Sequence, residues 1–341
     1  MKALRILVLM HRDLVPPDDM KGYSDREITE WKTEFDVVST LKEMGHEVFP
    51  LGLFDDLGLI RKALDEIKPH VSFNLLEEFH GQSLFDYHIA SYMELLKQSY
   101  TGCNPRGLMV AHDKALSKKI MAYHRIRTPQ FTVYPMSKKI KISKRLKFPL
   151  FVKSLYEEGS YGISHASIVT NEEKLIERIQ YLHEKKRTPV IAEEFIDGRE
   201  LYIPVIGNTR LTVLPALELE FGSMPEKIPR IATSKVKWDW SYQDQYGIDV
   251  IPAKLDVQQI DRIIKLGKRL YHILGLSGYA RIDIRLTDDD KIYVLEANAN
   301  PDIAYGGEMS TAAELGGMTY ESLLQKIINL GMRYSPDIRN M

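Results

Sequence analysis

Acidic and amide side chains stand at alternate positions in two stretches near the carboxyl end of the chain. In the first stretch, Arg281 and Asp283 fall on one face of a predicted β-strand, because successive side chains of a strand point to opposite sides. In the second, Glu296 and Asn298 share a face in the same way. Three aspartates at 288–290 lie between the two stretches and are typical of a turn, so the sequence predicts a β-hairpin.

The opposite faces of both strands are apolar. For Asp283 and Glu296 to face the same side of the hairpin, the loop between the strands is expected to hold an even number of residues, since side chains alternate with period two. The apolar residues expected to back the polar faces are Ala280, Ile282, Ile284, Tyr293, Leu295 and Ala297.

Asp283, Glu296 and Asn298 offer two carboxylates and an amide oxygen as candidate metal ligands. Oxygen ligands of this kind suit Mg²⁺, which usually binds one or two carboxylates together with substrate phosphates. An alternative is a surface ladder of ion pairs. The apolar alternation and the following Asn300 and Pro301 favour a metal–nucleotide site, with Arg281 beside it.

Composition excludes several classes of protein. A chain of 341 residues is expected to form two or three domains, and 44% hydrophobic and 27% charged residues are ordinary for a globular protein. The 46 basic and 47 acidic residues give a net charge of −1, so no long-range field would attract nucleic acid or an anionic membrane. Neither is expected as a partner.

Cys103 is the lone cysteine, which excludes a disulfide framework within the chain and suits a reducing compartment. A small buried apolar side chain is the favoured interpretation of Cys103, with a nucleophile as the alternative. The first ten residues contain too short an apolar run for a signal peptide, and no stretch reaches membrane-spanning length. The expected location is the cytoplasm.

Strand and helix patterns alternate through the first hundred residues. Such alternation predicts an α/β fold with an open, mostly parallel sheet whose ligands gather at the carboxyl ends of the strands. A long polar segment, 13–25, follows the first strand and is expected to be functional or mobile. The expected strands are 4–10, 47–51 and 71–75, and the expected helices are 28–45, 57–67 and 83–96.

The pattern changes near Asp113, where short strands and two helices predict a small α+β unit in the centre of the chain. Its expected elements are helices 113–123 and 172–182 and strands 131–134, 150–153, 164–169, 190–195 and 201–205. A further sheet is expected to begin at 211–219, followed by a helix at 258–274, the hairpin and a closing helix at 320–330.

Lys153 ends a predicted strand and is followed by a loop containing Gly159, Ser160 and Gly162. Glycines let a loop fold close over phosphate oxygens and donate backbone N–H groups to them, and Ser160 adds a hydroxyl. The loop lacks the Gly-Lys-Ser/Thr ending of a P-loop, and a plain hairpin turn is an alternative. Lys114, at the start of a helix, could reach a phosphate or be an exposed first-turn lysine.

The strand at 190–195 and the turn after it have the features of an adenosine site. The backbone of Glu194, Phe195 and Ile196 could supply the donor and acceptor that an adenine edge needs, while Glu193 accepts from its amino group. Glu200, just past the turn, could accept hydrogen bonds from ribose hydroxyls. An ordinary edge strand with solvated glutamates is the alternative.

Taken in order, these motifs resemble the ATP-grasp superfamily, and most closely the D-alanine–D-alanine ligase-like carboxylate–amine ligases. The resemblance covers nearly the whole chain, and the ordered set of motifs is specific for the superfamily. The matching segments are 73–75, 100–102, 113–114, 151–153, the loop at 159, 193–200, 281–283, 296–298 and 317–320.

The resemblance implies three domains with ATP held between the second and third. They are a Rossmann-like N-terminal domain (1–112), a small central ATP-grasp subdomain (113–200) and a C-terminal ATP-grasp domain with the metal site (201–341).

The resemblance also implies a role for each candidate residue. Lys114 and Lys153 would bind the phosphates, and the loop with Gly159, Ser160 and Gly162 would close over them. Arg281 would face the reacting carboxylate, and Lys237, which precedes Trp238, would lie near the γ-phosphate. The adenosine ligands would be Glu193, Glu194, Phe195, Ile196 and Glu200, and Asp283, Glu296 and Asn298 would hold two Mg²⁺ ions, with Mn²⁺ as the alternative metal.

Three departures from the family pattern concern the substrates. In the family, a glycine-rich loop after the first strand carries the glutamate that holds the first alanine's ammonium group. Residues 11–17 stand at this position here, and that glutamate is not identifiable among them. Residues 299–302 replace Thr-Ser-Pro-Gly, and the serine that anchors the second alanine's carboxylate falls near Gly306 and Gly307. These departures argue against a true D-alanine–D-alanine ligase.

The expected function is therefore ATP-dependent formation of an amide or peptide bond through an acyl phosphate, with a small carboxylate and a small amine as substrates. The acyl substrate is expected near the segment 13–23, Glu77, Glu78 and His80, with ordinary solvated loop residues as the alternative interpretation. The alternatives are a carboxylate–thiol ligase, a kinase, and a nucleotide-binding partner protein without turnover. Family members often dimerise, so a homodimer is included among the expectations.

Overall fold

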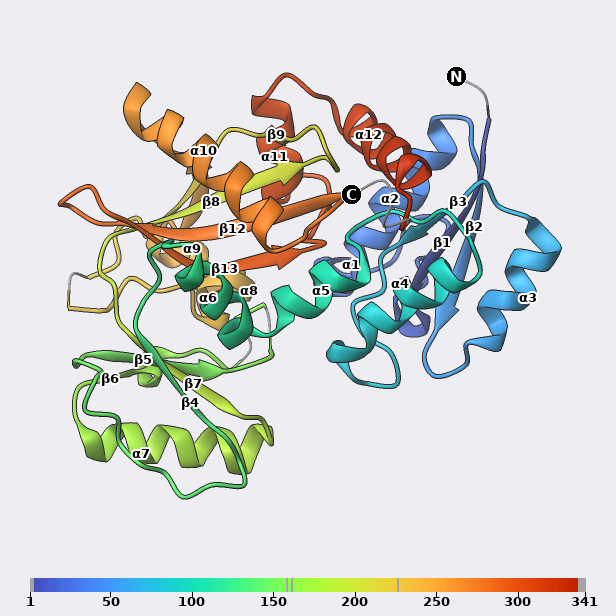
Figure 1. The fold of residues 1–341 in the computed structure, drawn as a ribbon. Helices are drawn as coiled ribbons and strands as arrows, with labels where there is room; N and C mark the ends of the chain where they lie inside the picture. Colours follow the sequence, from blue (N-terminus) through green and yellow to red (C-terminus); the bar gives the residue numbers. More distant parts are fainter. Residues whose placement is uncertain (1–2, 158, 161, 226, 337–341) are drawn as a thin grey trace.

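The computed structural model describes residues 3–336 apart from 158, 161 and 226. Its N-terminal part contains a three-stranded parallel sheet in the order β2-β1-β3, which confirms the predicted open parallel sheet (Figure 1). The strands are β1 (Arg5–His11), β2 (Glu47–Leu53) and β3 (Val71–Asn74).

Both faces of the parallel sheet are buried, as βαβ connections require. Along β1, Ile6, Val8 and Met10 pack on one side, with α2 and α12, while Leu7 and Leu9 pack on the other, with α3, α4 and α5.

The predicted helix at 28–45 is divided at Trp31 into α1 and α2, and α5 was not predicted. The helices of this part are α1 (Asp25–Glu30), α2 (Lys32–Glu43), α3 (Gly58–Ile67), α4 (Asp86–Leu95) and α5 (Pro105–His112), joined by α12 (Tyr320–Arg333) from the C-terminus.

The centre of the chain forms a four-stranded antiparallel sheet in the order β4-β7-β5-β6, which is packed against α7 (Glu172–Tyr181) (Figure 1). The predicted strand at 164–169 is only partly correct, because Ser164 caps a 3₁₀ turn at His165–Ser167 and leaves two residues for the strand. The strands are β4 (Phe131–Tyr134), β5 (Leu150–Ser154), β6 (Ile168–Val169) and β7 (Val190–Glu194).

A third sheet, antiparallel, has the order β11-β10-β8-β12-β13 with β9 beside β8. The prediction that 201–205 belongs to the small central unit is wrong, because β8 pairs along its whole length with β12. The strands are β8 (Arg199–Ile206), β9 (Thr212–Val213), β10 (Leu217–Glu220), β11 (Asp249–Pro252), β12 (Tyr279–Leu286) and β13 (Ile292–Ala299).

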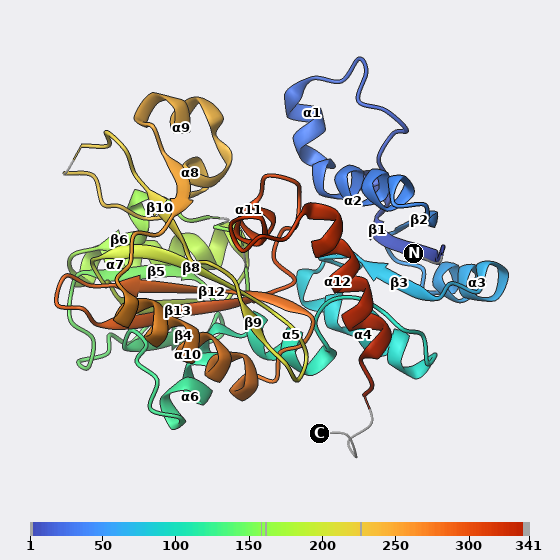
Figure 2. The same ribbon diagram turned by 90° about the horizontal axis from the view of Figure 1, so that it is seen from above.

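Helices surround this third sheet. The helix α10 (Val257–Ile273), which begins with a capping box between Asp256 and Gln259, packs on the apolar face of β8. In Figure 2, α8 (Ser234–Trp238) and α9 (Trp240–Tyr246) lie at the upper left of the view and α1 lies at the upper right. The helix α11 (Glu308–Leu315) lies between them.

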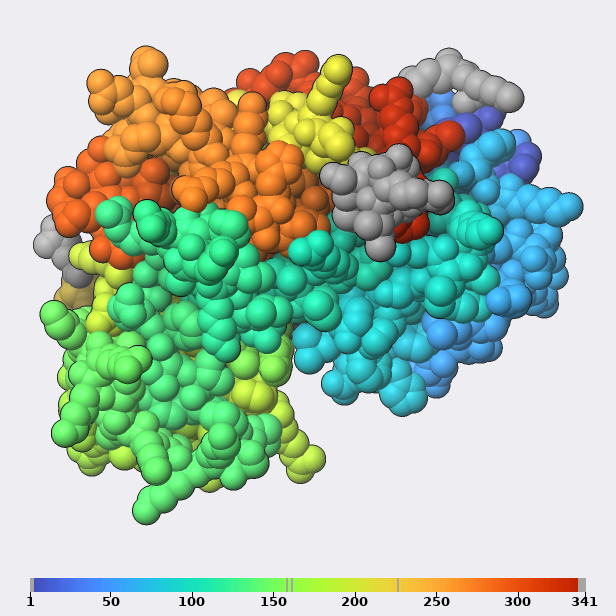
Figure 3. Space-filling model, in the orientation of Figure 1, coloured from blue at the N-terminus to red at the C-terminus, as the bar shows by residue number. Residues whose placement is uncertain are grey.

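In the space-filling view, the lobe built from β4 to β7 and α7 stands out from the rest, with a recess between it and the N-terminal lobe (Figure 3). The helix α6 (Lys114–Tyr123) leads from one lobe into the other. Within the described ranges, no helix combines the length and the apolar character needed to cross a membrane.

Candidate active site

The hairpin of β12 and β13 brings the predicted metal ligands together. In its ladder, Asp283 lies opposite Glu296 and Arg281 lies opposite Asn298. The reverse side of β12 is apolar, as predicted, because Ala280, Ile282 and Ile284 are buried in the core with α10. The period-two pattern therefore directs the polar side chains of β12 to one face.

A β-bulge corrects the expectation of an even loop. The turn between the strands is residues 287–291, which is an odd number, and the register shifts between Asp283 and Ile284. Leu295 is the extra residue, and its side chain lines the cleft instead of packing into the core. The prediction was wrong because a bulge places two residues opposite one and so reverses the alternation beyond it.

Arg281 and Asp283 form a bidentate ion pair, with nitrogen–oxygen distances of 2.8 and 2.9 Å. The same carboxylate accepts a hydrogen bond of 3.0 Å from the Asn298 amide. The remaining terminal nitrogen of Arg281 donates to Glu308 at 3.0 Å. Burial opposes the charge on Arg281, but Asp283 and Glu308 outweigh it and hold the pKa of the guanidinium well above its usual value.

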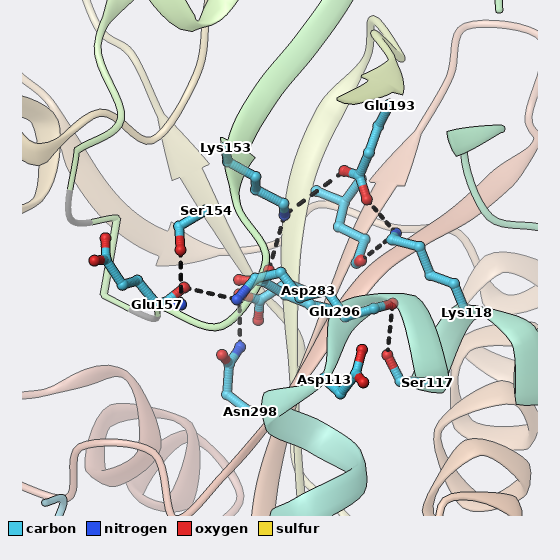
Figure 4. Close-up of polar contacts among 12 residues, drawn as sticks. Asp113, Ser117, Lys118, Lys153, Ser154, Glu157, Glu193, Asp283, Glu296 and Asn298 are labelled. Atoms are coloured by element: carbon cyan, nitrogen blue, oxygen red, sulfur yellow. Dashed lines mark hydrogen bonds and ion pairs between the residues drawn. The ribbon is translucent and has the colours of Figure 1, made fainter. Parts of the chain in front are cut away.

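Lys153, on β5, donates to the Glu296 carboxylate at 2.9 Å (Figure 4). Lys114 begins α6, where Asp113 caps the helix, and its Nζ lies 4.0 Å from the same carboxylate oxygen. Burial opposes ionisation of Glu296, but Lys153, Lys114 and Lys118 outweigh it and lower its pKa. The alternative of an exposed Lys114 is wrong, since its side chain is buried and donates to the Glu157 carbonyl at 2.7 Å.

Glu193 is buried at the back of the cleft, between two lysines (Figure 4). Its oxygens lie 3.0 Å from Lys118 Nζ and 3.6 Å from Lys153 Nζ. Lys118 also donates to the Leu295 carbonyl at 2.6 Å, which fastens α6 to the bulge of β13. Both lysines beside Glu193 therefore help to fix its carboxylate in the position expected to meet adenine.

The glycine loop follows β5. Gly159, Ser160 and Gly162 all have positive φ, which glycine adopts readily and serine rarely. Gly159 and Ser160 line the cleft, whereas the Gly162 carbonyl accepts a hydrogen bond from Arg178 of α7. The loop therefore presents its first part to the cleft and its last part to α7.

The segment with α8 lies against this loop. The Ser234 hydroxyl donates to the Ser160 carbonyl at 2.6 Å, and the Trp238 indole donates to the Gly159 carbonyl at 2.9 Å. Lys237, between them, has its Nζ 3.9 Å from Glu308 and 5.1 Å from the centre of the Tyr202 ring. Lys237 is thus brought to the same end of the cleft as Arg281.

The strand end expected to bind adenosine lies at the opposite side. The N–H groups of Glu194 and Phe195 donate to the carbonyls of Gln130 and Pro149, so the candidate adenine donor moves to the Ile196 N–H. Glu200 is buried, and its carboxylate accepts a hydrogen bond of 2.6 Å from Arg285.

A single cleft gathers nearly all of the predicted residues. It encloses about 700 Å³ of empty space, its open mouth included. Lys114 and Gly162 are not among its lining residues. The predicted residues that line it are Lys153, Gly159, Ser160, Glu193, Glu194, Phe195, Ile196, Glu200, Lys237, Arg281, Asp283, Glu296 and Asn298.

Three charged residues of the site were not predicted. Arg285 could have been found, because it shares the polar face of β12 with Arg281 and Asp283. Lys118 could also have been found, because it stands one helical turn after Lys114. Glu308 carries no such signal, since it reaches Arg281 from the first position of α11.

Comparison with known proteins identifies the family. A family model described as the D-ala D-ala ligase C-terminus matches residues 114–329, which is more than half of the chain. The chain belongs to this family. Among similar sequences, the D-alanine–D-alanine ligase of Aquifex aeolicus is 29% identical over 311 residues, covering 89% of this ligase and 96% of that protein. The uncharacterized protein y4sG of Sinorhizobium fredii is 28% identical over 305 residues, covering 87% and 86%.

Solved structures agree on the fold. The D-alanine–D-alanine ligase from Bacillus anthracis complexed with ATP has a TM-score of 0.75 at 24% identity, covering 97% of this ligase and 98% of that chain. The VanG D-Ala:D-Ser ligase from Enterococcus faecalis has a TM-score of 0.71 at 20% identity, covering 97% and 100%. The predicted ATP-grasp fold is confirmed, and so is the enzyme class, an ATP-dependent carboxylate–amine ligase.

Proposed function

We propose that the ligase activates a small carboxylate by transfer of the γ-phosphoryl group of ATP, giving an acyl phosphate and ADP. A small amine then attacks the acyl carbon, so that an amide bond forms and phosphate leaves. The observation that carries the proposal is the convergence of Asp283 and Glu296 with Lys153 and Arg281 in one cleft, with Lys114 4.0 Å from the Glu296 carboxylate. Phosphoryl transfer depends mainly on such positioning and on compensation of charge.

The residues of the hairpin fit Mg²⁺. Asp283 and Glu296 face each other across the ladder with Asn298 beside them, and all three carry the oxygen ligands that Mg²⁺ prefers. Among the described residues, no three His, Cys, Asp or Glu side chains form a ready-made metal cluster, so phosphate oxygens would complete the coordination. Two Mg²⁺ ions, or Mn²⁺ in their place, would neutralise charge on the phosphates during transfer.

The ion pairs of the cleft indicate how Arg281 and Lys153 could become available to bind substrate groups. Arg281 is bonded to Asp283, and Lys153 is bonded to Glu296. If Asp283 and Glu296 held metal, Arg281 and Lys153 would be released from these two carboxylates, and they could then bind the reacting carboxylate and the phosphates while keeping Glu308 and Glu193 as neighbours. Arg281 would then stabilise the oxyanion formed when the amine attacks, a contribution of roughly 3–4 kcal/mol for a well-placed donor.

The acid is proposed to differ from D-alanine. In place of the family's glycine-rich loop, β1 ends at His11, whose Nε2 lies 3.4 Å from the Glu78 carboxylate. These groups lie at the carboxyl end of the parallel sheet, where ligands of open α/β sheets bind. We propose that residues 1–112, 113–200 and 201–341 form the three domains that the family pattern implies. ATP would bind between the second and the third domain, and the acyl substrate between the first and the third.

Trapping with hydroxylamine tests the proposal. The ligase is incubated with MgATP, hydroxylamine and single amino acids, beginning with D-alanine, and hydroxamate and ADP are measured. An acyl phosphate gives a hydroxamate without any amine substrate, and Asp283→Asn or Glu296→Gln is expected to abolish both products. ADP release without hydroxamate for every acid would indicate a kinase, and ADP release unaffected by both substitutions would contradict the metal site.

A further inference from the structure

We infer that Arg285 is a positioning residue that holds Glu200 ready for the ribose hydroxyls of the nucleotide. The inference rests on the proposed nucleotide site and extends it to a residue that does not itself contact the reacting atoms. Arg285 lies on the cleft face of β12, two residues beyond Asp283, and it is directly opposite Glu200 in the ladder between β12 and β8.

The contacts of Arg285 explain why an arginine stands here. Its Nη2 donates to the Glu200 carboxylate at 2.6 Å and to the Arg230 carbonyl at 2.7 Å, and its Nη1 donates to the Gly198 carbonyl at 2.6 Å. The guanidinium also lies 6.0 Å from the centre of the Phe195 ring. A planar fork with five N–H donors can make these contacts at once, whereas a lysine offers one ammonium group at the end of a flexible stem.

The position of Glu200 makes this support necessary. Arg285 is 3% exposed and Glu200 is 7% exposed, and removing a carboxylate from water is costly unless a cation pairs with it. Arg285 bonds to Oε2, while among the described residues Oε1 has only a long contact of 3.4 Å with the Tyr202 hydroxyl. Oε1 is therefore the oxygen that can accept from a ribose hydroxyl, and its direction depends on the Arg285 bond.

Arg285 also connects the ribose end to the segment that precedes α8. Arg230, whose carbonyl it binds, lies between β10 and the helix that carries Lys237 and Trp238. The Gly198 carbonyl belongs to the turn that joins β7 to β8. A single side chain thus fixes the turn, the ribose carboxylate and the approach to α8 relative to one another.

The test compares binding of MgATP and of Mg–2′-deoxyATP by isothermal titration calorimetry. The wild-type ligase is expected to bind ATP about tenfold more tightly than 2′-deoxyATP, because a hydrogen bond to a charged group is lost with the 2′-hydroxyl. In Arg285→Met, ATP affinity is expected to fall about tenfold while 2′-deoxyATP affinity falls much less, so that the preference disappears. A purely structural role would weaken both nucleotides equally.

Arg262→Met is the matched control. Arg262 also pairs with a carboxylate, Asp290, and donates to its carbonyl at 2.8 Å, but it lies on α10 at the tip of the hairpin. Its substitution is expected to leave both affinities unchanged. Circular dichroism and thermal melting confirm that each variant is folded. If Arg285→Met does not fold, Arg285→Lys is measured instead. Its preference for ATP over 2′-deoxyATP is expected to be smaller than that of the wild type but still present.

The possible outcomes distinguish a failure of the inference about Arg285 from a failure of the proposed function. Equal losses for both nucleotides, or an unchanged preference in the Arg285 variant, overturn the role of Arg285 while leaving the nucleotide site intact. A wild-type ligase that binds ATP without any preference over 2′-deoxyATP overturns the ribose contact of Glu200, and with it the inference. A wild-type ligase that binds neither nucleotide overturns the proposed function itself.

Discussion

Lys118 and Glu193 form an ion pair in the interior of the ligase, with Nζ 3.0 Å from Oε1 and both side chains almost fully buried. Burial lowers the pKa of Lys118 despite the attraction of Glu193. Lys118→Met leaves the buried Glu193 with Lys153 as its remaining cation, 3.6 Å away, and leaves the Leu295 carbonyl without its donor. The substitution is therefore expected to lower the free energy of unfolding by about 3 kcal/mol. Urea denaturation measures the loss.

Two further variants make the measurement specific. Lys119→Met removes the neighbouring lysine, which is exposed, and is expected to change stability by no more than about 0.5 kcal/mol. The double variant Lys118→Met with Glu193→Met is expected to recover much of the lost stability, because the buried carboxylate that lost Lys118 is removed as well, while Lys153 keeps Glu296. A Lys118→Met protein as stable as the wild type would show that the pair does not contribute.

Glu308 is expected to control turnover rather than nucleotide binding. Burial opposes its ionisation, but Arg281 and Lys237 outweigh it and lower its pKa, so it holds both cations at the reacting end of the cleft. Glu308→Gln is expected to reduce ADP formation by roughly 10–100-fold through misplacement of these groups. Glu314→Gln, on the exposed side of the same helix, is the control. Equal rates in the two variants would exclude this role.

Glu34 is expected to make stability depend on pH. Burial, with Glu77 and Asp302 nearby, raises its pKa from 4.5 to about 8. Between these values the folded protein binds more protons than the unfolded chain, so stability falls as pH rises from about 4.5 to about 8, by up to about 1.4 kcal/mol per pH unit. Glu34→Gln is expected to flatten this slope, which urea unfolding between pH 5 and pH 8 measures. The exposed Glu30→Gln is the control, and parallel slopes in both variants would contradict the prediction.

Trp238 is expected to report on closure of the glycine loop. Its indole is half exposed and donates to the Gly159 carbonyl, so a nucleotide that moves the loop changes its surroundings. Tryptophan emission is expected to change on addition of MgATP, and Trp238→Phe is expected to abolish most of that change. Trp240→Phe, which removes a second half-exposed indole, serves as the comparison and is expected to retain it.

Much of the site follows from local patterns in the sequence. Alternation along β12 places Arg281 and Asp283 on one face, because each strand residue is turned by half a revolution from the last. The same rule fails on β13, where a bulge reverses the alternation at Leu295. Nothing in the residue types near Leu295 marks the bulge, which depends on pairing with β12.

Contacts between distant elements could not be predicted. The burial of Lys114 depends on the Glu157 carbonyl and Glu296, which tertiary folding brings to the start of α6. The approach of Glu308 to Arg281 depends on the path of the chain between β13 and α11. The domain limits, a homodimer and a cytoplasmic location stay predictions.

The bulge at Leu295 has a consequence for engineering the hairpin. Because the orientation of Glu296 and Asn298 is set at the bulge, residues 287–291 need only reverse the chain direction. These residues are mostly exposed and form the tip of the hairpin, away from the cleft. A short epitope or dye-binding peptide inserted at this tip would leave the ligand-binding end of the ribbon in its original alignment.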